Sequence, residues 1–446
     1  MTDEYNDIQS RLLTTLQAKL EAAGQNLSKL EHRDKPGRRK KLKLAFVKET
    51  LDNSIAELES WQKICEPSWF CWIKLALASP TVNTALSGLS TTDSSSGSGL
   101  KTLIAAARDF RRAFEEPTET PQSVFIGERY LDGYTTVDVP SHSTKVVTLA
   151  GRPQRLIMDV IDVVPNTSDQ MKNVREFARR LRQSEHSIMG LLSCKGVVRH
   201  ADNTRISYLF RVPDCYHDIL GLRELLLSGR SHDSLSDRLE MAKQLAKAVY
   251  YVHLYDVVHK NIRPETILSL GKAGEGRVPS SVCLVGFQVI RMADGRTYPS
   301  SDLRWEKNLY RHPQRQGNNI EYFVMQHDIY SLGVCLLEIG LWESFVVYDG
   351  AEGAARPSPA LGLAEDLAEL KDPIMLKDHL VELSQSTRVR AKMGTKYSEV
   401  VETCLTCLDP DNDNFGDEKA FRDEDGIEVG ARYIDKVLGV LNGISV

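Results

Sequence analysis

The sequence VHKNIRPETI, residues 258–267, is the stretch on which an interpretation of the whole chain depends. A long apolar run with helical periodicity leads into it and ends near Tyr255, with Ser236 as the candidate N-cap. A β-rich run follows at residues 281–285. The stretch is therefore expected to be a loop between a long helix and a strand.

Upstream of this loop, the pattern from about residue 120 is that of strands. β-rich runs broken by Gly and Pro are followed by an amphipathic helix at about 168–183, whose inward positions include Val174 and Phe177. Two further strands should form a hairpin around Asp202-Asn203. The predicted strands are Val124–Ile126, Thr135–Val137, Lys145–Leu149, Leu156–Val164, Met189–Cys194 and Thr204–Val212.

Two motifs in this arrangement resemble those of protein kinases. VHKNIRPETI resembles the kinase catalytic loop, H-R-D-L-x-P-x-N, with His259 and Pro264 in register. The run DIYSLGVCLLEIG at 328–340 resembles the central helix of the kinase large lobe, D-x-x-S-x-G-x-x-x-x-E. The resemblance implies structural roles for Pro264 and for Asp328, because in the family this Asp supports the backbone of the catalytic loop.

The resemblance also implies a fold class and a domain organisation. We expect an α+β fold in which a bilobal protein-kinase-like domain follows an α-helical hairpin or bundle. The expected regions are a helical region at 1–83, a Ser/Gly-rich linker with a short helix at 84–119, and the kinase-like domain at 120–446. Within that domain, the small lobe is expected at about 120–213 and the large lobe at about 214–446.

The residues that carry phosphoryl transfer in kinases are replaced in this chain. The general base Asp corresponds to Asn261, and the two metal ligands correspond to Thr266 and to Gly286, which precedes a retained Phe287. Phosphoryl transfer depends on positioning and on charge neutralisation, so these losses predict a catalytically impaired module. No catalytic residue is expected in the degenerate loop of His259, Asn261 and Thr266, and neither a metal nor a cofactor is expected.

The nucleotide-binding features of the small lobe are missing as well. The strands lack a Gly-x-Gly-x-x-Gly loop, and the strand that should carry the phosphate-pairing Lys has Asp159 and Asp162 instead. Acidic side chains would repel ATP phosphates. Glu176 could stand at the ion-pairing position of the helix, but an exposed helix Glu is the simpler interpretation. Together with Gly286 and Phe287, it completes the set of candidate cofactor-binding residues.

Two alternatives stay open at this point. The chain could be an atypical active Ser/Thr kinase that holds magnesium through other carboxylates, such as Asp294 or Glu265. ATP and magnesium are expected as cofactors only in that case. The chain could also be a degenerate adaptor that binds no ligand at all.

The N-terminal region predicts two amphipathic helices, at about 4–31 and 44–58. The sequence LESWQK at 58–63, which leads into PSWF at 67–70, resembles the segment before the kinase-like domain in filamentous-fungal proteins with HeLo or prion-inhibition-and-propagation domains. That resemblance implies signalling in regulated cell death or self/non-self recognition. It also implies a protein partner that binds through the helices and the kinase-like domain.

The turn between these helices is basic, with Arg38, Arg39, Lys40, Lys41 and Lys43. This basic patch could bind an anionic membrane or act as a nuclear localisation signal. The simplest interpretation is a solvated helix N-terminus. We expect a cytoplasmic protein. A nuclear localisation signal would instead place it in the nucleus, and a membrane-binding patch would place it at a membrane surface.

Composition bounds the remaining possibilities. A net charge of −5 and a pI near 6.2 give no sign of a nucleic-acid partner. The start is polar and acidic and there is no apolar run of about 18 residues, so neither a signal peptide nor a transmembrane helix is expected. Cys404 and Cys407 lie in an apolar run and are interpreted as buried small residues rather than as metal or redox groups.

The C-terminal part predicts two helices, at 393–407 and 433–444. The acidic run at 409–418 has neither the Gly nor the Glu that a calcium-binding EF-hand loop needs at its sixth and twelfth positions. We therefore interpret it as a solvated loop.

Overall fold

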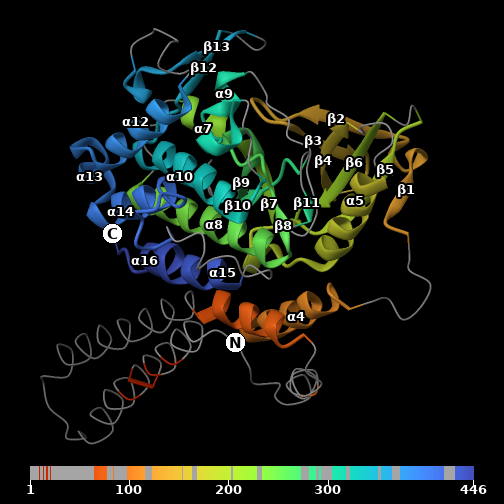
Figure 1. Ribbon diagram of the computed structural model, residues 1–446. Coiled ribbons are helices and arrows are strands. Elements are labelled where there is room, and N and C mark those ends of the chain that lie inside the picture. The colour runs from red at the N-terminus through yellow and green to blue at the C-terminus, as the bar shows by residue number, and fades with distance from the viewer. Residues whose placement is uncertain are drawn as a thin grey trace, which may run out of the picture.

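The computed structural model is a mixed α+β protein with several sheets (Figure 1). The residues that it describes are 65–77, 98–115, 123–152, 154–162, 168–201, 204–228, 234–272, 281–287, 291–292, 304–317, 322–349, 353–363, 372–415 and 427–445, together with 10, 14, 17, 18, 21 and 84. The basic patch at 38–43 and the predicted helices at 4–31 and 44–58 lie wholly or mostly outside these residues, as does Asp294.

A six-stranded sheet forms one side of the molecule (Figure 1). Its strand order is β1-β5-β6-β4-β3-β2, and all neighbours are antiparallel except β1 and β5, which are parallel. The strands are β1 (Phe125–Gly127), β2 (Tyr134–Asp138), β3 (Thr144–Leu149), β4 (Arg155–Asp162), β5 (Cys194–Arg199) and β6 (Arg205–Arg211). The predicted strands are therefore confirmed to within a few residues, except the one at 189–194.

The strand predicted at Met189–Cys194 is wrong in its position. Residues His186–Met189 form the short helix α6, which ends at Gly190 with a φ of 65°, a conformation that glycine adopts without steric cost. Leu191 and Leu192 are buried in the connection that follows. An apolar run of this length does not distinguish a strand from a helix end with a buried connection. The hairpin itself is confirmed, because β5 pairs antiparallel with β6.

Helix α5 (Ser168–Arg180) continues into the 3-10 turn η2 (Leu181–Gln183) and packs on β5. Its buried stripe of Val174, Phe177, Ala178 and Leu181 is the one that the sequence predicts. The ring of Phe177 meets the ring of Tyr208 on β6 edge-on, with centroids 5.8 Å apart. The apolar stripe therefore fixes which side of α5 faces the sheet, and it leaves Glu176 on another side.

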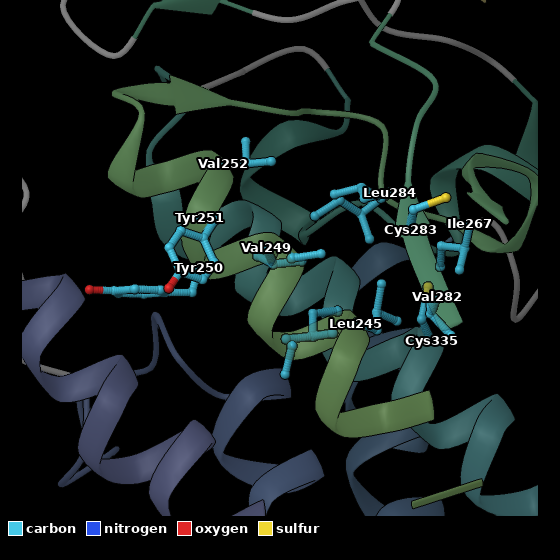
Figure 2. Packing of buried hydrophobic residues seen from close by; sticks show 14 of the residues in the cluster. Leu245, Val249, Tyr250, Tyr251, Val252, Ile267, Val282, Cys283, Leu284 and Cys335 are labelled. Atoms are coloured by element: carbon cyan, nitrogen blue, oxygen red, sulfur yellow. The ribbon is translucent and has the colours of Figure 1, made fainter. Parts of the chain in front are cut away.

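The helical part of the molecule is built on α8 (Leu235–Leu254) and α10 (Met325–Leu341), which pack against each other. Figure 2 shows how Leu245 and Val249 of α8 lie beside Cys335 of α10 and Leu284 of a neighbouring strand. Ser236 is not the N-cap that the sequence predicted. Ser234 caps α8 instead, in a capping box with Asp237, which satisfies two backbone N–H groups at once.

Strands anchor the loop at 258–267 on both sides. β8 (Val257–Val258) precedes it and pairs with β11 (Arg291–Met292), and β9 (Ile267–Lys272) follows it. β9 is the middle strand of a three-stranded antiparallel sheet with β7 (Tyr216–Gly221) and β10 (Ser281–Leu284). The loop is therefore held between two points of regular structure.

The other elements surround this core. They are η1 (Glu128–Leu131), α7 (Leu222–Leu227), η3 (Pro264–Thr266), α9 (Trp305–Asn308), η4 (Pro313–Arg315), β12 (Val346–Tyr348), β13 (Ala355–Pro357), η5 (Pro359–Leu361), α12 (Pro373–Gln385), α13 (Thr387–Met393), α14 (Thr395–Leu405), α15 (Ile427–Tyr433), the π-helical turn η6 (Ile434–Gly439) and α16 (Val440–Asn442).

Two C-terminal helices differ from their predicted bounds. Gly394, with a φ of 81°, separates α13 from α14, so the helix predicted at 393–407 spans only Thr395–Leu405. The last helical segment already includes Ile427, because α15, η6 and α16 follow one another without a break.

The described N-terminal segments pack on the helical part. Residues 65–75 are helical, and α4 (Ser98–Arg112) lies beside them under α8 (Figure 1). The ring of Phe70 meets Phe110 of α4 at 5.5 Å and Tyr251 of α8 at 5.3 Å, both edge-on. α4 confirms the short helix predicted before residue 119. In the part of the chain that the structure describes, no helix is both long and apolar enough to cross a membrane.

Candidate functional site

A carboxylate of α10 holds the loop at 258–267 from one side. Asp328 is fully buried, and its oxygens accept hydrogen bonds from the backbone N–H groups of His259 at 2.7 Å and Lys260 at 2.8 Å. His253 Nε2 lies 3.1 Å from the same carboxylate. Lys260 has a φ of 64°, which is uncommon for a residue with a side chain. Two charge-assisted bonds can hold such a turn, which is what the structural role inferred for Asp328 requires.

His259 joins the loop to the segment after β10. Its Nε2 lies 2.9 Å from the carbonyl oxygen of Val285, and because a carbonyl only accepts, Nε2 is the donor. Its ring also packs on Phe287 at 4.8 Å, and Phe287 packs on Phe177 of α5 at 4.6 Å. Burial lowers the pKa of His259 to about 4, so the imidazole is neutral at pH 7. His259 therefore acts as a structural link between the loop and α5.

The side chain of Asn261 is occupied by its neighbours. Its Oδ1 accepts a hydrogen bond from Arg263 Nε at 3.0 Å, and its Nδ2 donates to the Gly286 carbonyl at 3.4 Å. Thr266 Oγ1 lies 2.8 Å from the Asn261 carbonyl oxygen and accepts from Arg263 N at 3.2 Å. Pro264 begins the turn η3 between them and is buried. A carboxamide cannot act as a general base near pH 7. Both polar atoms of this one form hydrogen bonds that stabilise the loop.

Gly286 and Thr266 are packed directly against each other. Gly286 has a φ of 80°, and a Cβ added to it would stand 2.3 Å from Thr266 Cγ2 and 2.6 Å from Thr266 Cβ. No pair of carbon atoms approaches so closely without displacement, so a side chain at Gly286 requires Thr266 to move. The kinase resemblance predicts that these two positions correspond to the metal ligands of kinases. A larger residue at position 286 fits only if Thr266 moves or is replaced.

Asp159 of β4 faces the same segment. The side chain is fully buried, and its Oδ2 accepts a hydrogen bond from the backbone N–H of Phe287 at 2.6 Å. The carboxylate of Asp159 thus joins β4 to the residues after β10. A buried carboxylate at this place would oppose the approach of ATP phosphates.

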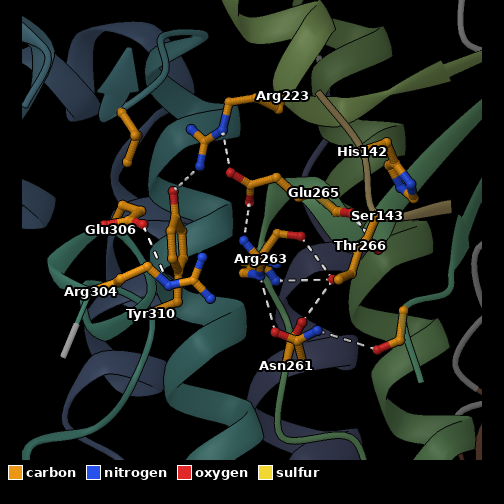
Figure 3. A network of polar contacts seen from close by, with 12 residues as sticks. His142, Ser143, Arg223, Asn261, Arg263, Glu265, Thr266, Arg304, Glu306 and Tyr310 are labelled. Carbon is orange, nitrogen blue, oxygen red and sulfur yellow. Dashed lines mark hydrogen bonds and ion pairs between the residues drawn. The ribbon is translucent and has the colours of Figure 1, made fainter. Parts of the chain in front are cut away.

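The turn at 139–143, between β2 and β3, reaches across to the loop. The backbone N–H and the hydroxyl of Ser143 both lie 3.1 Å from the carbonyl oxygen of Glu265 (Figure 3). His142 Nδ1 accepts from Thr144 N at 3.2 Å, and the ring lies against Gly221. The six-stranded sheet and the loop are therefore joined by direct hydrogen bonds.

Arg223 is the centre of a buried polar network that the sequence did not predict (Figure 3). Its guanidinium is fully buried and donates to Glu265 Oε1 at 3.1 Å, to Glu338 Oε1 at 2.9 Å and to the Tyr310 hydroxyl at 2.7 Å. Tyr310 in turn donates to Glu338 Oε2 at 2.9 Å. A buried charge is tolerated when it is paired and hydrogen-bonded, and here one cation serves two carboxylates on η3 and α10.

Glu265, the residue named as an alternative magnesium ligand, is engaged by this network. Burial alone would raise its pKa, but Arg223 and Arg263 outweigh burial and hold the pKa at about 2. The hydroxyl of Tyr348 adds a hydrogen bond to Oε1 at 3.0 Å. Its Oε2 makes no hydrogen bond but lies 3.4 Å from Arg263 Nη1, so two guanidinium groups already neutralise this carboxylate. Asp294, the other proposed ligand, lies outside the described residues.

Glu176 is neither an exposed helix residue nor paired with a lysine. Its carboxylate lies 2.6 Å from Arg179 Nη2 and 3.0 Å from Arg180 Nε, both on α5 itself. Burial alone would raise the pKa of Glu176, but the two arginines lower it below its ordinary value. The interpretation as a plain exposed Glu is therefore wrong, and this residue belongs to an ionic cluster on α5.

The cysteines and possible metal ligands can also be placed. Cys404 and Cys407 are buried and not disulfide-bonded, and burial raises the pKa of both thiols. The Cys407 thiol donates to the Gln326 carbonyl at 3.2 Å, so the pair packs as small core residues. Among the residues that the structure describes, no three His, Cys, Asp or Glu side chains lie together as a metal site would need.

The sequence missed Arg223, Ser143 and the contact between Gly286 and Thr266. Arg223 lies in the apolar run LRELLL, where a charged residue is more often solvent-exposed. The signal that could have marked it is the presence of Glu265 and Glu338 in segments expected to be buried, since buried carboxylates need a cation. Nothing in the sequence pairs Ser143 with Glu265, which follows it by 122 positions.

Known proteins add no identification. Comparison of the chain with protein-family models gives no match, and comparison with curated proteins gives none either.

The contact between Gly286 and Thr266 leads to a stability prediction. Gly286→Ala should lower the free energy of unfolding by about 2–4 kcal/mol, because it adds a clash to the cost of a left-handed alanine. Gly151→Ala is the matched control, since Gly151 has a φ of 77° but no atom within 4 Å of an added Cβ. It should cost only about 1 kcal/mol. Urea unfolding measures both.

The double variant Thr266→Ser/Gly286→Ala separates the two costs. Serine keeps the hydroxyl that bonds the loop and removes the methyl group that the new Cβ would meet. The double variant should recover about 1 kcal/mol or more of the free energy of unfolding that Gly286→Ala loses. If Gly286→Ala and Gly151→Ala lowered the free energy of unfolding equally, Thr266 would not restrict the side chain at position 286.

Proposed function

We propose that the chain is a protein-kinase-like module that is catalytically impaired and that works by binding other proteins. The order of elements supports a bilobal arrangement, with the six-stranded sheet and α5 as the small lobe and the elements from α7 onward as the large lobe. The two hydrogen bonds from the loop at 258–267 to Asp328 support a retained scaffold. A scaffold can be kept when its catalytic side chains are not.

The observation that carries the proposal is the 2.3 Å separation between an added Cβ at Gly286 and Thr266 Cγ2. The two positions that would hold magnesium in a kinase fill each other's space. Without those ligands, the charge on a transferring phosphoryl group has no partner, because catalysis of this reaction is mostly positioning and electrostatic stabilisation.

Two further contacts favour an adaptor that binds no nucleotide over a nucleotide sensor. Ser143 is hydrogen-bonded to the Glu265 carbonyl, so the turn between β2 and β3 rests on the loop. Asp159 places a carboxylate where a phosphate-pairing cation would be needed. An atypical active kinase is less well supported, since Glu265 is engaged by Arg223 and Arg263.

The biological setting is part of the same proposal. The resemblance of residues 58–70 to fungal HeLo-type proteins supports a role in cell-death or self/non-self signalling. In that setting the N-terminal helices would contact a protein partner, and the basic patch at 38–43 would contact an anionic membrane surface.

A thermal-shift titration with ATP, with and without magnesium, tests the proposal. At 1 mM ATP we expect a shift of the melting temperature below about 1–2 °C, because a ligand that binds no tighter than about 1 mM adds under about 0.5 kcal/mol. Magnesium-dependent stabilisation together with phosphate transfer to a protein substrate would overturn the proposal. Stabilisation by nucleotide without transfer would keep the impaired kinase-like module and replace the ligand-free adaptor with a nucleotide sensor.

A further inference from the structure

Two described N-terminal segments pack together under α8. We call residues 65–77 and 98–115 the N-terminal strap. The two parts are tied together by Arg111 of α4, whose guanidinium donates to the carbonyl oxygens of Ala76 at 3.0 Å and Leu77 at 2.6 Å. Because this arginine is itself buried, it holds the two segments of the strap together as one unit.

Aromatic rings fix the strap to the C-terminal half of α8. Phe110 lies 5.1 Å from Tyr255, and Phe114 stacks on the same ring at 6.0 Å with an angle of 13° between planes. At the other end, the hydroxyl of Tyr250 donates to the Pro67 carbonyl at 3.0 Å. Aromatic contacts of this kind add to the stability from burial alone, so the strap is firmly seated on α8.

Asp256, at the end of α8, connects the strap to α5. Its two carboxylate oxygens are divided between two cations, with Oδ1 bonded to Lys74 of the strap and Oδ2 lying 3.2 Å from Arg180 of α5. Asp256 has a φ of 57°, so the turn that presents this carboxylate is itself in an uncommon conformation. One carboxylate therefore bridges two elements that are far apart in the sequence.

The facing side of α5 carries matching groups. The guanidinium of Arg180 lies 4.7 Å from the centre of the Phe114 ring, and it also bonds the Tyr255 carbonyl. Arg179 donates to the carbonyl oxygen of Glu115 at 3.0 Å. Glu176 binds both arginines and so orients them toward the strap. The groups of α5 that could have served a nucleotide site are turned to the N-terminal segment instead.

We propose that the N-terminal strap sets the position of α5, so that displacement of the strap is transmitted to α5 through Asp256 and Arg180. Through this bridge, the position of α5 would depend on whether the strap is packed on α8. A partner that displaces the strap would destabilise α5, and with it the six-stranded sheet on which α5 packs. This inference goes beyond the proposed function, since it holds whether or not the chain binds nucleotide.

Hydrogen–deuterium exchange of the full chain without nucleotide tests the coupling. Asp256→Asn keeps a residue that tolerates the left-handed turn but removes the charge that joins Lys74 to Arg180. We expect exchange in both residues 65–77 and α5 to become roughly five- to tenfold faster, because local opening becomes less costly. Asp138→Asn is the control, since it breaks the exposed Lys145–Asp138 pair on the sheet and should leave α5 unchanged.

A second variant decides the direction of the effect. Lys74→Met leaves every contact between Asp256 and α5 in place and removes only the positive charge that the strap contributes to this bridge. Faster exchange in α5 of this variant would establish that the strap stabilises α5 through Asp256. Unchanged exchange in α5 would overturn the proposal, whether or not residues 65–77 themselves exchange faster.

Discussion

Arg223→Met should lower the free energy of unfolding by about 3–5 kcal/mol, the largest effect that we expect from a single substitution in this protein. The substitution keeps much of the side-chain volume but leaves the carboxylates of Glu265 and Glu338 buried without their shared cation. The hydroxyl of Tyr310 also loses a donor. Urea unfolding at pH 7.5 measures the loss.

The control for this prediction is Arg388→Met. Arg388 pairs with Glu343 at 2.7 Å, but both side chains are more than one third exposed, so the change should cost less than about 1 kcal/mol. A triple variant, Arg223→Met with Glu265→Gln and Glu338→Gln, should recover part of the stability because no unpaired charge stays buried. Equal losses for Arg223→Met and Arg388→Met would mean that the network does not hold η3 to α10.

Acidification from pH 7.5 to 5.5 should lower the free energy of unfolding by about 7 kcal/mol. Burial lowers the pKa of five histidines among the described residues: to about 3 for His142 and His312, to about 4 for His186 and His259, and well below the ordinary value for His327. In the unfolded chain each titrates near 6.5. Below that pH the histidines bind protons in the unfolded state but not in the folded state. The free energy of unfolding therefore falls by about 1.4 kcal/mol per histidine at pH 5.5.

The pH window distinguishes this effect from that of the carboxylates. Stability from the histidines begins to fall near pH 6.5 and, for His142 and His312, continues to fall to about pH 3. Stability from Glu265, with its folded pKa of about 2, is lost only below its unfolded pKa of about 4.3. Burial raises the pKa of Glu66 and Glu338, and these two groups oppose the loss.

Urea unfolding at the two pH values tests the prediction. His142→Asn should reduce the difference by about 1.4 kcal/mol, because the amide oxygen can accept from Thr144 N as Nδ1 does but does not titrate. The same stability at pH 7.5 and 5.5 would contradict the prediction, and so would a His142→Asn variant with the full difference.

The elements that could be predicted from the sequence are those with a local signal. The stripe of α5 has a helical periodicity, β2, β3 and β4 are β-rich runs broken by Gly and Pro, and α10 is a long, largely apolar run. The predictions that failed depend on single residues rather than on periodicity. Gly190 ends α6 where a strand was expected, and Ser234 rather than Ser236 caps α8, because caps and turns are set by the conformation of one residue.

For the candidate site, the sequence predicts only which side chains differ from those of kinases. The kinase resemblance predicts that Asn261, Thr266 and Gly286 stand where kinases have other side chains. It does not show that Thr266 fills the space beside Gly286, or that Ser143 and Asp159 join the sheet to the loop. Those are contacts between residues that only the fold brings together.

What the sequence determined by itself, then, is the type and order of the elements and the identity of the side chains at the loop, because both are local properties of the chain. The tertiary structure decided which partner each buried group received. Arg223 lies between Glu265 and Glu338, and Asp256 lies between the strap and α5, since buried charges take whichever opposite charge the packing places within reach. Periodicity indicates that a face is covered, and only packing determines what covers it.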